Sequence, residues 1–410
     1  MPSGSTATAA TLSTIAPIDS LGDLTIPFVL AVIAAGLGAA AIAARVLRLP
    51  AATGRLASID GLRGLLAWFV FVHHGAHWYV FAHTGNWRHD GSRVVAYLGR
   101  GSVAMFFMIT AFLFTSRLLE TRVRGFDWLR FLVSRVLRLT PLYLAAMLVL
   151  FLCVAAASDF TRVEPWPVLA ANALRWLTFT VAGTPDLNGV HGTELWIAGV
   201  VWSLPYEWFF YLLLPLLALA IGCRVPWGWF ALAVAAAAGL WLFAPFWPFT
   251  LAFVPGMAAA WLVRSERFRT WSRSPLAALV VLAAVALAVA RFAFPFDAKA
   301  LALLGVAFAL IAGGNDLFGM LSWRCSRLLG DVSYSVYLLH GLFLAAVFHF
   351  GLGLESARGL SPGQHLALVV ALVPVLLLLV CATFRWIESP PLRRVDAVTA
   401  AIRAAFRRRA

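Results

Sequence analysis

The chain has 410 residues, of which 62% are hydrophobic and only 12% charged, and its mean hydropathy is +0.87. A soluble domain averages about 25% charged residues, so this composition excludes a globular domain and indicates a polytopic membrane protein. The net charge of +14 would suggest nucleic-acid binding on a soluble domain. No run of basic residues is interleaved with aromatic residues in a polar segment, so no nucleic-acid partner is expected, and we attribute the charge to arginine-rich cytoplasmic loops.

The N-terminal segment and the cysteines each exclude a feature. Residues 1–25 are rich in Ser, Thr and Ala and contain no Lys or Arg. A cleaved signal peptide begins with basic residues, so we expect a flexible tail on a retained helix. The four cysteines are widely spaced and form no C-x-x-C pair, which predicts neither a metal site nor a disulfide framework; they are Cys153, Cys223, Cys325 and Cys381.

Eleven apolar segments follow along the chain, each about 15–22 residues long, against roughly 20 residues needed to cross a bilayer core. The sequence therefore predicts an all-α membrane bundle of about 10–11 transmembrane helices. The two shortest segments could also be half-spans or tilted packing helices. The segments are 26–47, 61–82, 100–118, 139–157, 201–222, 227–245, 249–263, 275–294, 298–314, 329–350 and 365–385, and the two shortest are 249–263 and 298–314.

Arginines concentrate in the loops that fall on one side of the membrane if these segments alternate. Because the basic side faces the cytoplasm, we predict that the N-terminus lies outside and the C-terminus in the cytoplasm. Arg88 and Arg93 lie on the opposite side and are an exception. The arginine-rich segments hold Arg45, Arg48 and Arg55; six arginines in 117–138; four in 264–273; Arg324 and Arg327; and six more from Arg393 onward.

The stretch D-G-L-R-G-L-L-A-W-F-V-F-V-H-H-G, residues 60–75, places Arg63 and His74 in an otherwise apolar helix. Eleven residues of helix rise about 16 Å in roughly three turns, so the two side chains share one helix face. An ionisable group at mid-bilayer depth by default marks a functional site, but a histidine can also be a hydrogen-bonded contact between helices. For His74 both interpretations stay open, whereas His73 points about 100° away and is expected only to pack.

Two further motifs lie on the next predicted helices. In the stretch 97–114, small residues such as Gly99 and Gly101 let neighbouring helices approach closely. In R-F-L-V-S-R-V-L-R-L-T-P, residues 130–141, Arg135 and Arg138 share a helix face at the cytoplasmic boundary. Their spacing fits the ordinary excess of basic residues there. It also fits a clamp for a phosphate-bearing donor, because guanidinium groups match phosphate oxygens.

The longest outside loop, residues 158–200, contains Trp166, Trp176 and Trp196 and the polar stretch 183–194. These tryptophans are expected to form a belt at the membrane interface. The alternative is a platform for sugar rings, because aromatic faces bury apolar sugar surface.

The last three motifs place polar side chains in apolar segments. Glu207 lies about one turn inside its segment, where a carboxylate needs a partner. Ser333, Tyr337 and His340 recur at spacings of four and three and so share a helix face. In F-R-W-I-E-S-P-P, Glu388 is expected to pair with a nearby arginine, and Pro390 and Pro391 to end the final helix.

Taken in order, these motifs resemble those of the acyltransferase-3 family of integral membrane O-acyltransferases, which acylate sugars on O-antigen, exopolysaccharide, periplasmic glucans and small glycosides. The sequence departs from the family at Thr110-Ala111-Phe112, where Ser-Gly-Phe is usual, and has an additional upstream helix. The matching pieces are D-G-L-R-G with a histidine ten intervening residues after its arginine, G-R-G-S-V-A-M-F-F, R-F-L-V-S-R-V-L-R-L-T-P, W-S-L-P-Y-E-W-F-F-Y, G-D-V-S-Y-S-V-Y-L-L-H and I-E-S-P.

The resemblance implies a domain organisation and roles for nine residues. The expected parts are a tail (1–25), an extra helix and linker (26–56), an acyltransferase-3-like membrane domain (57–391) and a basic cytoplasmic tail (392–410). Residues matching the family's essential arginine–histidine pair and its serine–glutamate motif are expected to be catalytic: Arg63, His74 and Glu207. Six further residues are expected to bind substrate. Arg135 and Arg138 match the family's arginine pair that holds the donor, Ser203 matches the serine of its serine–glutamate motif, and Ser333, Tyr337 and His340 match its last motif.

The implied activity is transfer of an acyl group, acetyl first of all, from cytoplasmic acyl-CoA to a hydroxyl of a sugar or glycan at the outer side. His74 would act as general base, because an imidazole pKa of about 6.5 lies near the operating pH, or would itself carry the acyl group. The expected partners are acyl-CoA, a carbohydrate or glycolipid acceptor and the lipid bilayer of a bacterial cytoplasmic (inner) membrane, with a homo-oligomer left open. No metal is required. No C-terminal hydrolase-like domain follows, so transfer is expected to finish in the membrane domain or on another chain.

Two other functions fit part of the pattern. A transporter or flippase of an anionic glycolipid or glycan precursor would also carry intramembrane charges, but it predicts internal repeats, and none is seen. A scaffold subunit with vestigial motifs is disfavoured by the intact set of Arg63, His74 and Glu207.

Overall fold

The computed structural model describes residues 19–46, 57–87, 92–243 and 247–408. Within these ranges the regular elements are helices and no strand forms, so the predicted all-α membrane bundle is confirmed. Residues 1–18 of the predicted tail, together with Arg48, Arg55 and Arg88, lie outside the described residues.

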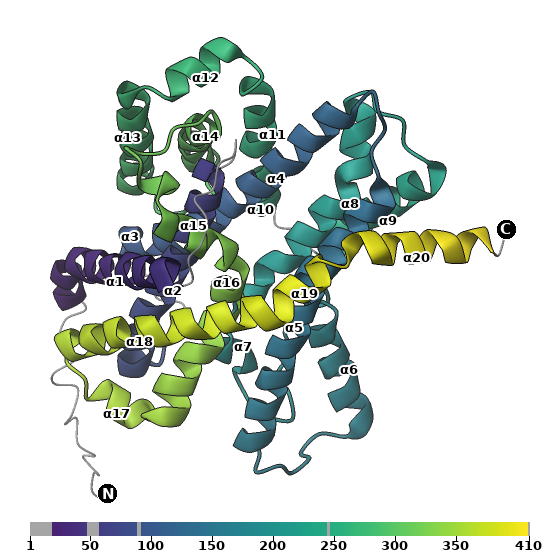
Figure 1. The fold of residues 1–410 in the computed structure, drawn as a ribbon. Helices are drawn as coiled ribbons and strands as arrows, with labels where there is room; N and C mark the ends of the chain where they lie inside the picture. Colours follow the sequence, from purple (N-terminus) through teal and green to yellow (C-terminus); the bar gives the residue numbers. More distant parts are fainter. Residues whose placement is uncertain (1–18, 47–56, 88–91, 244–246, 409–410) are drawn as a thin grey trace, which may run out of the picture.

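The first third of the chain forms helices α1 to α5, with the π-helical turn η1 between α3 and α4 (Figure 1). The π-helical turn η1 leads directly into α4, so the two form one continuous helical run. The elements are α1 (Asp19–Val46), α2 (Ala57–Thr84), α3 (Arg93–Ala96), η1 (Tyr97–Gly101), α4 (Ser102–Thr121) and α5 (Trp128–Ala157).

The middle third begins with the loop 158–200 and then forms shorter apolar helices. It contains α6 (Trp166–Leu177), α7 (Thr193–Trp196), η2 (Val200–Ser203), α8 (Leu204–Ala220), α9 (Trp227–Phe243), α10 (Trp247–Leu251), α11 (Phe253–Leu262), α12 (Glu266–Ser272), α13 (Pro275–Arg291) and α14 (Ala298–Ala312). Helices α12 and α13 meet at a bend of 77°.

The last third ends in a long helical run that crosses the molecule to the C-terminus (Figure 1). It contains η3 (Met320–Ser322), α15 (Arg324–Asp331), α16 (Ser333–Ala345), η4 (Ala346–Gly351), α17 (Leu354–Arg358), α18 (Pro362–Thr383), η5 (Phe384–Glu388), α19 (Ser389–Leu392) and α20 (Val395–Arg407).

Each of the eleven predicted segments coincides with helix, but the segments differ in their ability to span. By length and apolar composition, six helices of the described chain could cross a membrane, or seven if the bent α12–α13 pair is one span. Helix α2 is long enough but is not among them, because its histidines lower its hydropathy. The shorter apolar helices are 227–242, 248–262 and 298–312, the last two being those expected to be doubtful. The predicted orientation of the termini stays a prediction.

Glycines of the first motif let α2 lie directly against the backbone of η3 and α15. A Cβ atom at Gly61 would lie 1.9 Å from the carbonyl oxygen of Leu321, and one at Gly64 would lie 2.5 Å from that of Ser326. Gly330 faces α2 in the same way, since a Cβ there would lie 2.2 Å from the carbonyl oxygen of Asp60. Contacts this short exclude any side chain, so these glycines fix the position of Arg63 between them.

The prolines near the end of the chain test one prediction about the C-terminal run. The run α18–η5–α19 ends at Leu392, one residue after Pro391, so the prediction that Pro390 and Pro391 end this helix is confirmed; a further helix that was not predicted, α20, begins after a turn at 393–394. The prolines follow the π-helical turn η5 and lie in the first turn of α19.

The final helix α20 is held to α5 by two ion pairs. Arg130 lies 2.7 Å from Asp396, and Arg403 lies 2.6 Å from Asp127, which also caps the start of α5. Burial raises the pKa of Asp127, but the hydrogen bonds from Arg403 and from the backbone N–H of Arg130 outweigh burial and hold this pKa below its usual 3.8. The basic segment at the end of the chain is therefore docked on the bundle as a helix.

Candidate active site

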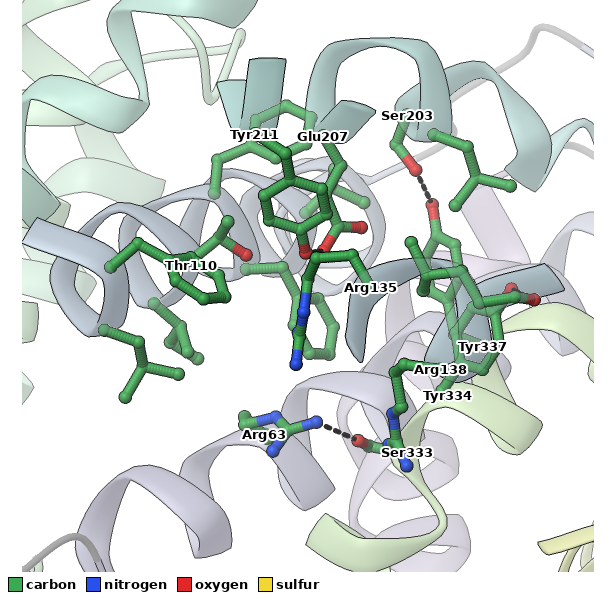
Figure 2. Close-up of a pocket in the computed structure, with 18 residues that line it drawn as sticks. Arg63, Thr110, Arg135, Arg138, Ser203, Glu207, Tyr211, Ser333, Tyr334 and Tyr337 are labelled. Carbon is green, nitrogen blue, oxygen red and sulfur yellow. Dashed lines mark hydrogen bonds between the residues drawn. The ribbon is translucent and has the colours of Figure 1, made fainter. Parts of the chain in front are cut away.

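A cavity with an empty volume of about 840 Å³ lies between α2, α4, α5, α8 and α16 (Figure 2). We call it the arginine cavity, because three guanidinium groups gather in it. Seven of the nine residues predicted from the sequence line it: Arg63, Arg135, Arg138, Ser203, Glu207, Ser333 and Tyr337. Residues from five separate helices are thus brought to one space.

Two of the three arginines are held by polar partners. Arg63 donates from Nη2 to the hydroxyl of Ser333 at 3.4 Å, and its Nη1 lies 3.7 Å from the carboxylate of Asp60. Arg138 places Nη1 3.4 Å from Oε2 of Glu388, whose side chain is 0% exposed. Glu388 also accepts a hydrogen bond from Ser335. The prediction that Glu388 pairs with an arginine is therefore confirmed.

Arg135 differs, because it is held by aromatic faces and no carboxylate is paired with it. Its guanidinium carbon lies 5.1 Å from the ring centre of Phe114 and 5.8 Å from that of Tyr211. Nη2 donates to the hydroxyl of Ser134 at 2.9 Å, but the buried Nε has no hydrogen-bond partner. A buried donor without a partner is costly in a folded protein. Arg135 is thus placed to accept an anionic ligand.

Glu207 lies in the arginine cavity and not beside His74. It is in the first turn of α8 and accepts a hydrogen bond from the hydroxyl of Tyr211, the same ring that faces Arg135. The cavity wall thus carries three arginines against one carboxylate, and that carboxylate is already engaged. The guanidinium groups that line the cavity suit a phosphate-bearing molecule.

A second cavity, with an empty volume of about 870 Å³, contains His74, and we call it the histidine cavity. The histidines of α2 form one side of it and residues of η1, α7 and η2 the others. Arg63 and His74, although on one helix, therefore line different cavities. The lining residues are Val70, His73, His74, His77, Trp87, Gly99, Arg100, Val103, Glu194, Leu195, Ala198, Gly199, Val200, Trp202 and Tyr337.

The hydrogen bonds of His340 define the protonation of His74. Nδ1 of His340 lies 2.7 Å from the carbonyl oxygen of Val336, so it carries the proton and donates. Nε2 of a neutral His340 is then an acceptor, and it lies 2.9 Å from Nδ1 of His74. His74 must therefore donate from Nδ1, which leaves the lone pair on its Nε2.

His340 itself is fully buried and lines neither cavity. The glycine that follows it allows this position, because a Cβ at Gly341 would lie 2.4 Å from the backbone carbonyl carbon of Ile197. The late motif thus splits into three positions along α16: Ser333 contacts Arg63, Tyr337 lines both cavities, and His340 contacts His74.

Several lining residues were not predicted from the sequence. His73 was expected only to pack, but it lines the histidine cavity and donates from Nδ1 to the carbonyl of Val95 at 2.7 Å. Thr110, at the departure from the family pattern, lines the arginine cavity. Further unpredicted lining residues are His77, Trp87, Arg100, Tyr211, Glu194, Trp202 and Tyr334.

The three tryptophans of the loop 158–200 do not form the expected interfacial belt, because two of them are buried. Trp166 is 67% exposed, but Trp176 and Trp196 are buried inside the protein. Trp176 donates from Nε1 to the carbonyl of Pro185 at 2.9 Å, and Trp196 packs against His349. None of the three lines either cavity. The polar stretch of that loop instead contributes Glu194 to the histidine cavity.

A family model described as an acyltransferase domain matches residues 56–386. The chain belongs to the acyltransferase-3 family. Comparisons with curated proteins and with solved structures gave no match. As an acyltransferase-3 protein with several apolar helices, the chain is a multi-pass membrane acyltransferase. Among its described residues, no group of three His, Cys, Asp or Glu side chains is arranged to hold a metal ion.

Proposed function

We propose that this acyltransferase moves an acyl group, acetyl by preference, from cytoplasmic acyl-CoA to a hydroxyl of a sugar or glycan at the outer side of a bacterial inner membrane. The observation that carries the proposal is the pairing of a basic cavity with a histidine cavity along one helix, α2. One cavity suits a phosphate-bearing donor, and the other holds a base beside space for an acceptor.

The donor occupies the arginine cavity in this proposal. Its phosphates lie against Arg135, Arg138 and Arg63, and the unpartnered Nε of Arg135 gains an acceptor. The pantetheine arm, which is narrow and mostly apolar, extends toward the histidine cavity. Glu207 and Tyr211 hold Arg135 in place, which gives Glu207 a positioning role in donor binding.

His74 supplies the base. Its Nε2 takes the proton of the acceptor hydroxyl while the hydroxyl oxygen attacks the thioester carbonyl, so a C–O bond forms and the C–S bond breaks. The proton passes from His74 to the departing thiolate, which leaves as the free thiol of CoA. His340 fixes the tautomer of His74 from behind and is a positioning residue. In the alternative route, His74 first takes the acyl group and then gives it to the hydroxyl.

The acceptor lies in the histidine cavity. Trp87 and Trp202 offer aromatic faces, and Arg100 and Glu194 offer charged groups that bind hydroxyls. Aromatic faces with a few polar groups are the usual composition of a sugar site. Glu194 accepts a hydrogen bond from Thr184 at 2.8 Å, which holds its carboxylate in place.

The deciding experiment uses proteoliposomes with radiolabelled acetyl-CoA on one side and a crude bacterial glycan extract on the other. The proposal expects saturable donor binding and label on the glycan across the bilayer, with none in empty liposomes. Label that stays with the donor, after propionyl- and succinyl-CoA have also been tried, would refute it. Movement of an unmodified glycolipid across the bilayer would instead favour a transporter, because a transporter could also contain two such cavities.

A further inference from the structure

The arginine cavity and the histidine cavity are adjacent, and two side chains line both of them: Val103 of α4 and Tyr337 of α16. Both side chains are buried, with exposed fractions of 5% and 8%. Under the proposed function, the donor is held by Arg135 and Arg138 in one cavity, but the reacting base is in the other. The acyl group must therefore pass between Val103 and Tyr337.

Tyr337 is held across this passage by hydrogen bonds to η2. Its hydroxyl donates to the carbonyl oxygen of Val200 at 2.9 Å, and Oγ of Ser203 lies 2.7 Å away (Figure 2). The ring of Phe106, on the same helix as Val103, meets the ring of Tyr337 edge-on at 6.0 Å. The hydrogen bonds of this one hydroxyl contribute little net free energy, so the Tyr337 side chain can move when a ligand arrives. Val103 makes no hydrogen bond through its side chain, so its effect on the passage depends on its size alone.

We propose that Val103 and Tyr337 form a gate between the two cavities, and that the side chain of Val103 limits the size of the acyl group that passes. This inference rests on the proposed function and adds a specificity-determining residue to it. Ser203 serves as the latch that returns Tyr337 to the closed position. A single methylene in an apolar passage is worth about 10- to 200-fold in selectivity, so one side chain suffices to separate acetyl from longer groups.

The test compares acetyl-, propionyl- and butyryl-CoA as donors to the glycan extract, using Val103→Ala and Val103→Phe. Val103→Ala is expected to raise the ratio of butyryl to acetyl transfer by about tenfold or more. Val103→Phe is expected to abolish transfer of all three acyl groups, because the larger side chain closes the passage. Val281→Ala is the matched control, because Val281 is a buried valine of α13 that lines neither cavity.

The outcomes separate the gate from the function. Wild-type protein that transfers no acyl group from any of the three donors refutes the proposed function and the gate with it. Wild-type transfer with an unchanged butyryl-to-acetyl ratio in Val103→Ala refutes the gate alone. If Val103→Phe does not fold, the ratio in Val103→Ala decides.

Discussion

The arginine cavity and the histidine cavity, which α2 lines at different heights, use their polar side chains differently. In the arginine cavity, Arg63 and Arg138 are tied to carboxylates or hydroxyls, and Arg135 keeps one buried N–H unpaired. In the histidine cavity, His74 donates a hydrogen bond from Nδ1 to His340, and its Nε2 keeps a lone pair. In our proposal the first arrangement binds an anion and the second accepts a proton. Binding and chemistry should therefore be separable by substitution.

The largest effect is expected in the histidine cavity. Because a general base contributes about 10²- to 10⁴-fold, His74→Ala should lower turnover by that factor and leave the Kd for acetyl-CoA unchanged. His83→Ala is the control, since His83 lies on the same helix and lines neither cavity. Substantial turnover by a folded His74→Ala protein would remove His74 from the chemistry.

A second prediction distinguishes the arginines from each other by stability. Arg138→Ala leaves the fully buried Glu388 without its cation, and breaking a buried pair in this way costs about 3–5 kcal/mol. Arg135→Ala should cost less, because no carboxylate depends on it. Unfolding in detergent would show the difference, and Arg138→Ala/Glu388→Gln should recover most of the lost stability. Equal destabilisation by the two single variants would contradict this account of Arg138.

A third prediction concerns the affinity of the arginine cavity for the donor. Arg135→Ala should raise the Kd for acetyl-CoA about tenfold or more, since a hydrogen bond to a charged group contributes about 1.5–3 kcal/mol. Turnover at saturating donor should change little. Arg385→Ala is the matched control, because Arg385 is exposed in η5 and outside the cavity. Equilibrium binding of radiolabelled acetyl-CoA measures the effect.

The smallest effect concerns the docking of α20, away from both cavities. The pKa of Asp127 is lower in the folded protein than its usual 3.8, so its ion pair with Arg403 stabilises the fold above that pH. That stabilisation is lost as pH falls through the lowered value. Hydrogen exchange should show α20 losing protection below about pH 4. Asp127→Asn should show weaker protection at neutral pH and less dependence on pH; a wild-type pH profile in that variant would contradict the prediction.

Sequence patterns predicted the helices and the contents of the arginine cavity well. Spacing along a helix places Arg135 beside Arg138, and Ser333 beside Tyr337, because 3.6 residues per turn fix which side chains share a face. The same rule cannot say which neighbouring helix that face meets. It therefore gave no sign that Arg63 and His74 line different cavities, or that His340 lies behind His74 and not beside a ligand.

The lining residues from loops and short elements were the hardest to predict. Trp87 and Glu194 lie in or beside non-helical segments, where no periodic pattern indicates direction. The close backbone contacts between helices were also not predicted, although Gly61, Gly64 and Gly341 could have indicated where they occur. Helix α20 was also missed, because the prolines indicated a helix end but not that another helix starts after them.

The separation of donor binding from chemistry is tested most directly by one paired measurement. The Kd for radiolabelled acetyl-CoA and the rate of a single turnover at saturating donor would be measured for Arg135→Ala and His74→Ala in the same preparation. We predict a raised Kd with a near-normal rate for Arg135→Ala, and a normal Kd with a rate lowered about 10²- to 10⁴-fold for His74→Ala. Loss of the same quantity in both variants would show that the two cavities act as one site and would contradict the account.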